Sequence, residues 1–312
     1  MVHAALGKTR SHSDHPCYNF QAKERWGRIH LPVAPRCNIQ CNYCNRRYDC
    51  ANESRPGVTS RIMGPGDAVA YLNSALKFRT DISVIGIAGP GDALCDPGRT
   101  LATIRAVRDL YPDMLFCLST NGLNLPEHVA SLAEAGVTHV TVTVNAIDPA
   151  VGEKIYAWVS KEGTTFRGRE AAALLISRQM DAIRSLKAKG IVVKINSVIL
   201  PGINEDHLPE IARKVAALGA DVLNCLPAIP VAGTPFAALG TPSSAGMSRI
   251  RRSASVHMPL MNHCRRCRAD ASGMLEENCV EPKIPENDTI SGFRRTEPGP
   301  SCISCKNTLT TA

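Results

Sequence analysis

The chain has few aromatic side chains and no long apolar run, and these two shortages exclude several classes of protein. Only 4% of its 312 residues are Phe, Trp or Tyr, which is too few for a surface that stacks on nucleic-acid bases. No stretch approaches the roughly 18 apolar residues of a membrane-spanning helix. The first residues, MVHAALGKTRSHSDHPC, lack the apolar centre of a secretory signal. We therefore expect a cytoplasmic protein that binds no membrane and no nucleic acid.

The composition is otherwise that of a globular protein with a basic balance. Hydrophobic residues make up 44% and charged residues 21% of the chain, and 36 Lys and Arg against 28 Asp and Glu give a net charge of +8. A length of 312 residues suits either one α/β barrel or two smaller domains. Because the low aromatic content argues against nucleic acid, the excess of positive charge favours an anionic substrate.

Cysteine is abundant, with 13 residues, an odd number, in a sequence without a secretory signal. Disulfide frameworks belong mainly to small secreted domains, whereas cysteine clusters in larger intracellular proteins usually bind metals or take part in catalysis. The cysteines therefore predict a metal-binding or catalytic protein.

Predicted strands and helices alternate along most of the chain. The predicted strands are 28–34, 82–87, 115–118, 139–144, 191–198 and 222–226, and the predicted helices are 65–79, 98–110, 127–135, 169–189, 207–218 and 244–257. This alternation implies parallel pairing, because each crossover returns the chain to the same end of the sheet. We predict an α/β fold, a partial (β/α)6 barrel whose active site lies at the carboxyl ends of the strands.

The alternating pattern occupies residues 28–258 and leaves an extension at each end. Residues 259–312 begin with the cysteine-rich HCRRCRADASGMLEENC and, beyond Glu281, become rich in Pro and Gly and poor in apolar residues. We predict that residues 1–27 supply metal ligands to the barrel, and that the chain ends in a mostly unstructured tail after the cysteine-rich extension.

Three cysteines with the spacing CxxxCxxC, namely Cys37, Cys41 and Cys44, follow the first predicted strand. A tight loop places such thiols on one face, where three of them hold an iron–sulfur cube and leave one iron open to a substrate. Cys50, six residues further on, is a candidate fourth ligand. The alternative is therefore a closed structural cluster or a zinc site.

This motif, placed after a strand and before a βα alternation, resembles the radical SAM superfamily. In that superfamily three cysteines hold a 4Fe–4S cluster, and its open iron binds the amino and carboxylate groups of S-adenosylmethionine. The resemblance extends to the NifB family, whose members build the carbide-containing iron–sulfur core of the nitrogenase cofactor. It is carried by HPCYNFQAKERWGRIHLPVAPRCNIQCNYCNRRYDC, AGPGDAL, LSTNGL and CRRCRADASG, and it covers roughly residues 11–280.

The resemblance implies contacts to S-adenosylmethionine at the strand ends. The glycines of AGPGD let backbone approach a ligand closely, although such pairs also occur in plain turns. Ser, Thr and Asn at strand ends suit ribose and carboxylate groups, although they are also common helix caps. The predicted cofactor contacts are Gly89, Gly91, Asp92, Ser119, Asn121, Thr143, Asn145, Ile195 and Asn196.

A NifB-type reaction fuses two further 4Fe–4S clusters, so the resemblance implies two more ligand sets. The first is His12, Cys17 and Cys117, in which a neutral histidine suits a cluster that must be released. His15 and His30 are alternatives to His12 as the histidine ligand. His12 itself could instead be a mobile terminal residue that binds no cluster. The alternative for Cys117 is a buried core cysteine.

The second ligand set is the CxxC pair Cys264 and Cys267, with Cys279 as a third ligand. A CxxC pair by itself also suits zinc or a redox disulfide. Cys302 and Cys305 form another such pair without an assigned role. Arginines beside the first pair would stabilise an anionic cluster, or would simply form a solvated basic surface.

The implied reaction begins with transfer of a methyl group from one S-adenosylmethionine to a precursor cluster. A deoxyadenosyl radical from a second S-adenosylmethionine then abstracts hydrogen from that methyl group, and further deprotonation leaves carbide inside a fused eight-iron cluster. Losing protons requires a base, and Glu53 and Cys50 lie just past the cysteine loop. Glu53 could instead be a loop residue that forms a salt bridge. Cys50 could instead be a transient ligand during cluster transfer.

The resemblance also implies partners, namely iron–sulfur cluster donors, an electron donor such as ferredoxin or flavodoxin, and a carrier that accepts the product. We expect a monomer that lacks the additional carrier domain of many NifB proteins. Two rival functions stay open. One is a different radical SAM enzyme with an auxiliary cluster, of the molybdopterin or peptide-modifying type, and the other is a non-catalytic iron–sulfur carrier.

Overall fold

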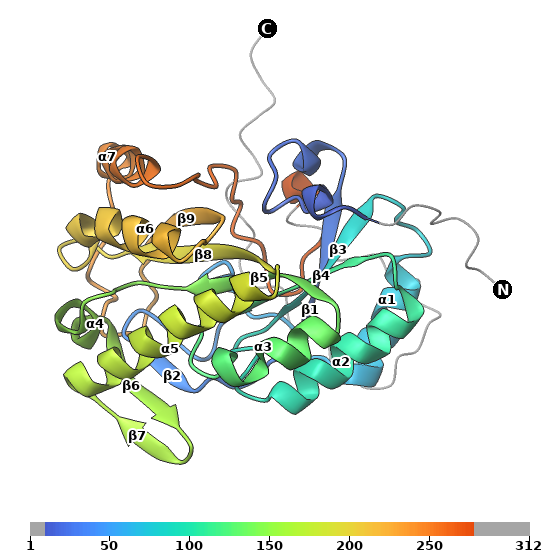
Figure 1. Ribbon diagram of the computed structural model, residues 1–312, viewed down its shortest axis with the longest axis horizontal. Helices are drawn as coiled ribbons and strands as arrows, with labels where there is room; N and C mark the ends of the chain where they lie inside the picture. The colour runs from blue at the N-terminus through green and yellow to red at the C-terminus, as the bar shows by residue number, and fades with distance from the viewer. Residues whose placement is uncertain (1–9, 278–312) are drawn as a thin grey trace, which may run out of the picture.

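Six strands with alternating polar and apolar residues form a parallel sheet at the centre of the computed structural model, which describes residues 10–277 (Figure 1). They are β1 (Gly27–Pro32), β3 (Ile82–Ala88), β4 (Leu115–Thr120), β5 (Val137–Thr143), β8 (Val192–Ile199) and β9 (Val222–Pro227). The strands pair in chain order, as expected when each crossover takes the chain to the next strand in the same sense. The fold is the predicted α/β partial barrel.

Seven α-helices lie within the described residues, and most of them form the crossovers. They are α1 (Pro65–Ala75), α2 (Pro97–Leu110), α3 (Leu125–Glu134), α4 (Pro149–Ile155), α5 (Gly168–Ala188), α6 (Leu208–Ala217) and α7 (Ser244–Ser255). Proline lies in the first turn of five of them, where its missing N–H costs nothing. Figure 1 shows α2, α3 and α5 along one face of the sheet. Across residues 10–277, no helix has both the length and the apolar character that crossing a membrane requires.

Alternation along the strands gives the sheet two different faces. Successive side chains of a strand point to opposite faces of the sheet. In β5, Val140 and Val142 therefore point into the hydrophobic core, and His139 and Thr141 point to the other face. Thr141 pairs with Lys194 on β8, and His139 pairs with a cysteine on β4. Polar and thiol groups of neighbouring strands therefore share the inner face, opposite the helices.

A second, antiparallel sheet was not anticipated from the sequence. It contains β2 (Ile39–Cys41), β6 (Tyr156–Lys161) and β7 (Thr164–Phe166). The cysteine loop was expected to be irregular, and no element was expected between residues 144 and 169. Strands of three to six residues and the short helix α4 are too brief for a periodic pattern to reveal them.

The two ends of the described chain lie side by side, at the top of Figure 1. His263 Nε2 donates a hydrogen bond to the Pro16 carbonyl oxygen at 2.9 Å. The short strand β10 (Ser272–Gly273) pairs antiparallel with β1 and extends the sheet. The cysteine-rich extension is thus built into the barrel's edge, while the predicted tail beyond Glu281 lies outside the described residues.

Candidate functional site

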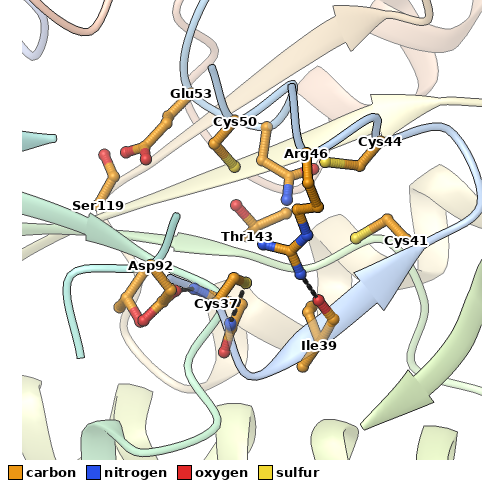
Figure 2. Close-up of a pocket in the computed structure, with 13 residues that line it drawn as sticks. Cys37, Ile39, Cys41, Cys44, Arg46, Cys50, Glu53, Asp92, Ser119 and Thr143 are labelled. Atoms are coloured by element: carbon orange, nitrogen blue, oxygen red, sulfur yellow. Dashed lines mark hydrogen bonds between the residues drawn. The ribbon is translucent and has the colours of Figure 1, made fainter. Parts of the chain in front are cut away.

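The cysteine loop and the carboxyl ends of the neighbouring strands surround a pocket of about 380 Å³, counting the space at its mouth (Figure 2). Its lining residues are Cys37, Ile39, Cys41, Cys44, Arg46, Cys50, Asn52, Glu53, Asp92, Ser119, Thr120, Asn121 and Thr143. The structure therefore brings the three motif cysteines together with four predicted cofactor contacts and both predicted proton-transfer residues. The active site was expected at this end of the barrel.

The cysteine loop is held in shape by hydrogen bonds within the chain and by the pairing of β2 with β6. The Gln40 amide donates to the carbonyl oxygens of Cys41 at 3.0 Å and Cys44 at 2.8 Å. Arg46 donates to the Ile39 carbonyl and, at 3.1 Å, to the Gln40 amide oxygen. These bonds fix the shape of the loop.

The three motif thiols fit an iron–sulfur cluster. They form no disulfide, and burial raises the pKa of Cys37 to about 11 and that of Cys41 to about 12, and also raises that of Cys44. The Arg46 charge lowers all three and so favours thiolates. In a 4Fe–4S cube each cysteine binds a different iron, so three separate thiols leave one iron open.

Asp92 joins the loop after β3 to the end of β4. Its buried carboxylate accepts hydrogen bonds from the Thr120 hydroxyl at 3.0 Å and from the Asn121 backbone N–H at 2.5 Å. Burial raises the pKa of Asp92, and these bonds oppose that rise. The Asn121 amide in turn donates to Asn38 Oδ1 at 2.7 Å and to Cys37 Sγ at 3.6 Å. Asp92 therefore positions a strand end against the cysteine loop.

The glycines of AGPGD approach the chain's own backbone. A Cβ added to Gly89 would lie 2.3 Å from the Ala34 carbonyl oxygen, and one added to Gly91 would lie 2.0 Å from that of Arg36. The Gly91 N–H also donates to the Ala34 oxygen at 2.9 Å. Neither glycine lines the pocket. Their evident role is to pack the loop after β3 onto the segment that leads into the cysteine motif.

Glu53 and Ser119 face each other across the pocket wall (Figure 2). Burial raises the pKa of Glu53 well above its usual value, and its hydrogen bond with Ser119 opposes that rise. Burial likewise raises the pKa of Cys50 well above its usual value, and the Glu53 charge adds to the effect. Both groups therefore bind a proton more tightly than they would in water, which suits a proton-transfer role.

Besides the two glycines, three more predicted cofactor contacts lie outside the pocket lining. The Asn145 amide donates to the Tyr43 hydroxyl at 2.6 Å, and the Asn196 amide donates to the Asn52 carbonyl oxygen at 2.8 Å. Ile195 is fully buried, and strand alternation directs it to the helix-covered face of the sheet. These residues support the pocket through bonds and packing.

Four lining residues were not identified from the sequence: Ile39, Arg46, Asn52 and Thr120. Arg46 and Asn52 lie in the cysteine loop, and Thr120 lies between two residues that were identified. Proximity to a motif was the only available signal, because none of these residue types forms a recognisable pattern of its own. Their roles depend on loop geometry that only the folded chain shows.

A second group of reactive side chains, which we call the inner cluster, occupies the inner face below this pocket. It consists of His15, Cys17, Tyr18, His30, Cys117, His139 and Lys194. Burial raises the pKa of Cys117 to about 12, and the nearby Cys17 raises it further. Cys17 also packs against the small cluster formed by Cys267, Ala271 and Leu275, and its pKa responds to the charges of Cys267 and Cys264. The structure thus brings Cys17 near both predicted ligand sets, while Cys279 lies outside the described residues.

The three candidate histidines occupy different places. The His12 ring lies 5.4 Å from the His139 ring, and the buried His15 ring lies 4.6 Å from it. His30 lies beside Cys117, because a Cβ added to Gly86 between them would be 3.0 Å from the His30 ring and 3.1 Å from Cys117 Sγ. Of the three candidates, His30 is the one placed next to Cys117 by these distances, and His139 pairs with Cys117 from β5.

Comparisons with known proteins agree with this geometry. The model of the Radical SAM superfamily matches residues 31–215. Among solved structures, the FeFe-hydrogenase maturase HydG from Carboxydothermus hydrogenoformans aligns with a TM-score of 0.52 at 13% identity, covering 82% of this chain and 59% of that chain. Methylornithine synthase PylB aligns with a TM-score of 0.50 at 15% identity, covering 87% and 80%. At these identities the likeness concerns the fold alone.

Sequence relatives are closer. The FeMo cofactor biosynthesis protein NifB of Chlorobaculum tepidum is 50% identical over 264 residues, which are 85% of this chain and 62% of the relative. The NifB proteins of Klebsiella pneumoniae and Azotobacter vinelandii are 47% and 45% identical over 85% of this chain, but the chain spans only 57% and 53% of their length. The chain belongs to the radical SAM superfamily, and within it resembles the NifB proteins.

Proposed function

We propose that this chain binds two 4Fe–4S clusters as substrates, methylates one of them and joins them into an eight-iron cluster with a carbide at its centre. The observation that carries the proposal is the shared wall formed by β4. Ser119 lines the upper pocket, and Cys117, two residues earlier on the same face, belongs to the inner cluster. Two strand residues span about 7 Å, so a group in the pocket and a substrate at Cys117 are close neighbours.

The pocket residues hold and shield the reacting groups. When bound at Cys37, Cys41 and Cys44, a 4Fe–4S cluster with S-adenosylmethionine supplies a methyl group and a carbon radical. Asp92 and Asn121 fix the cysteine loop against the strand end through their bonds. The ordered loop keeps this chemistry away from bulk solvent and directs it toward β4.

We assign His30 and Cys117 as ligands of one substrate cluster. His30 Nδ1 lies 3.2 Å from the Arg268 carbonyl oxygen, which can only accept, so Nδ1 carries the proton and Nε2 keeps a lone pair. A Cβ on Gly86 would lie 3.6 Å from that Nε2, in the same gap that Cys117 Sγ faces. A histidine whose other nitrogen donates to a backbone carbonyl is the usual form of a metal ligand.

The other substrate cluster is assigned to Cys264 and Cys267, joined by Cys17. Arg28 donates to Cys267 Sγ at 2.8 Å, and a buried guanidinium stabilises the thiolate that a cluster needs. Cys17, from the N-terminal segment, packs against the small cluster that contains Cys267. Both ends of the described chain would therefore contribute to one ligand set.

Glu53 is the proposed acceptor of protons from the methyl carbon. Its carboxyl lies between the upper pocket and the inner cluster, since it bonds Ser119 and feels the charge of Lys194. A carboxylate whose pKa is raised by burial is a stronger base than an exposed one and so accepts a proton more readily. Cys50, on the same loop, is a second proton carrier or a temporary ligand while a cluster moves.

Label transfer tests the proposal. The protein would be loaded anaerobically with iron and sulfide, reduced, and given S-adenosylmethionine labelled at the methyl carbon. We expect the label inside an extracted eight-iron cluster. Deoxyadenosine without label in any cluster would indicate a different radical SAM enzyme, and neither product from a folded, iron-loaded chain would indicate a carrier.

Three variants make the test specific to the assigned ligands. Cys117→Ala and His30→Ala should abolish labelled product while deoxyadenosine still forms. Cys225→Ala is the matched control, because Cys225 is a buried strand cysteine outside the pocket lining. Loss of product in the control as well would contradict the ligand assignment.

The same function implies partners and a compartment. Substrate clusters require iron–sulfur donor proteins, reduction requires ferredoxin or flavodoxin, and the product requires an accepting carrier. Exposed clusters and thiolates oxidise readily, so we place the protein in a reducing cytoplasm. Co-purification of the chain with a reduced flavodoxin or ferredoxin, and deoxyadenosine formation driven by it, would check the electron donor.

A further inference from the structure

Lys194 carries a buried charge that the proposed mechanism does not use. It lies on β8, opposite Thr141 of β5, and it is only 8% exposed. Its ammonium stands 4.8 Å from the centre of the Tyr18 ring. Throughout residues 10–277, no ion pair or hydrogen bond of this ammonium is found. A buried cation without an anionic partner is costly. An anionic ligand bound beside Lys194 would remove that cost.

The neighbours of Lys194 belong to both proposed substrate sites. The Tyr18 ring that the ammonium contacts belongs to the residue after Cys17 and lies 4.7 Å from the His139 ring, and His139 pairs with Cys117 across β5 and β4. Cys117 belongs to one ligand set, and Cys17 packs against the small cluster that contains Cys267 of the other. Lys194 therefore stands between the two places where anionic clusters would be held.

His15 provides a second donor without an acceptor. Its Nδ1 accepts the Cys17 backbone N–H at 3.2 Å, so the proton of the neutral ring sits on Nε2. That Nε2 is buried and has no partner within the described part of the chain. The His15 side chain is 2% exposed. An unpartnered N–H and an unpaired ammonium thus occupy the same inner cluster.

We propose that Lys194 and His15 form a binding position for the sulfide face of an anionic iron–sulfur substrate between Cys17 and Cys117. The inference rests on the proposed function, because it names how the substrate of that site is held. Lys194 is a positioning residue, since it supplies charge and donors to cluster sulfurs and no bond to iron. Hydrogen bonds and positive charge at the sulfurs also raise a cluster's reduction potential.

The test uses the full-length, cluster-loaded protein. Lys194→Met removes the charge and keeps a side chain of similar length, whereas Lys194→Arg keeps the charge. Lys187→Met is the control, because Lys187 pairs with Asp221 on the outside of the barrel. Iron per chain, the Mössbauer and EPR signals of each cluster, their reduction potentials and deoxyadenosine formation would be measured. Melting temperatures would confirm that every variant is folded.

We expect Lys194→Met to keep the cluster at the cysteine motif and to form deoxyadenosine. Its substrate clusters should be retained about 10- to 100-fold less tightly, as for loss of a hydrogen bond to a charged group, and should have lower reduction potentials. Lys194→Arg and Lys187→Met should behave like the unaltered chain, and His15→Phe should show a smaller loss.

Two results would overturn the inference. One is a folded Lys194→Met protein whose substrate clusters have unaltered occupancy and potential. The other is equal loss in the Met and Arg variants together with a lowered melting temperature, which would show a packing role. Failure of the proposed function is separate, because it would appear as absence of labelled eight-iron product in the unaltered chain whatever Lys194 does.

Discussion

At the scale of single residues, Gly91 makes the strictest demand on its position. Gly91→Ala would force a Cβ to within 2.0 Å of the Arg36 carbonyl oxygen, and overpacking of this kind typically costs about 1–3 kcal/mol. We expect a lower free energy of unfolding in anaerobic denaturant titrations and weaker binding of S-adenosylmethionine. Gly66→Ala is the control, because a Cβ there meets nothing within 4 Å. Equal stability of the two variants would refute the packing role.

Glu53 gives a prediction with a definite sign. Burial raises the pKa of its folded-state carboxyl well above the usual value, so the folded chain binds the proton more tightly than the unfolded chain. Stability from this proton is fully present below about pH 4.3, the ordinary glutamate pKa, and is lost as pH rises toward the folded pKa. The free energy of unfolding of Glu53→Gln, minus that of the unaltered chain, should therefore grow as pH rises.

Denaturant titrations across pH would measure that difference. Glu276→Gln is the matched control, because Arg265 lowers the pKa of Glu276 at the surface and the opposite, small trend is expected there. A difference for Glu53→Gln that stays flat with pH would mean that the carboxyl is not held protonated in the fold.

Single residues also show which parts of the site could be predicted from the sequence alone. Cys37, Cys41 and Cys44 were predictable because a fixed spacing after a strand reports a local loop. Ile195 was predicted as a cofactor contact and lies outside the pocket lining, because a shift of one residue along a strand reverses the face. His12 was predicted as the ligand that joins Cys117, with His15 and His30 as alternatives, because which imidazole approaches Cys117 depends on contacts with residues far along the chain.

At the scale of elements, α5 supports the pocket from the outer side through a single amide. Gln179 Nε2 donates to the carbonyl oxygens of Asn121 and Thr143, each at 2.8 Å, and so joins the ends of β4 and β5. Gln179→Met leaves both buried carbonyls without this donor, which costs about 1–3 kcal/mol. We expect a lower free energy of unfolding and weaker S-adenosylmethionine binding, measured by denaturant titration and calorimetry.

Ser177→Ala, at an exposed position of the same helix, controls for general effects on α5. If Gln179→Met bound S-adenosylmethionine as tightly as this control, the amide would have no part in shaping the pocket. The prediction follows from an inter-element contact that periodicity could not reveal. Periodicity did locate α5 itself, because 21 residues present a full apolar stripe, whereas the three-residue strand β2 presents none.

At the scale of the whole molecule, the two ends of the described chain meet at one buried side chain. Arg28 is fully buried and donates to the carbonyl oxygens of Gly273 at 2.5 Å and Met274 at 2.7 Å, and to Cys267 Sγ at 2.8 Å. The barrel's first strand therefore fixes the segment that carries the CxxC pair. Sequence proximity could not show this, because more than two hundred residues separate the partners.

Arg28→Met should separate the stability of the barrel from that of its cysteine-rich edge. Loss of hydrogen bonds from a charged donor costs about 1.5–3 kcal/mol each, so we expect a lower melting temperature and faster proteolysis near Cys267. Iron at the cysteine motif should persist, because that loop is held by its own bonds and by β6, whereas iron at Cys264 and Cys267 should fall. Arg25→Met, at a largely exposed arginine whose ion pair with Asp14 spans 4.0 Å, should change neither. Equal iron loss from both sites in Arg28→Met would instead mean that the barrel and its edge unfold together, since only a shared unfolding transition would empty a loop that Arg28 does not contact.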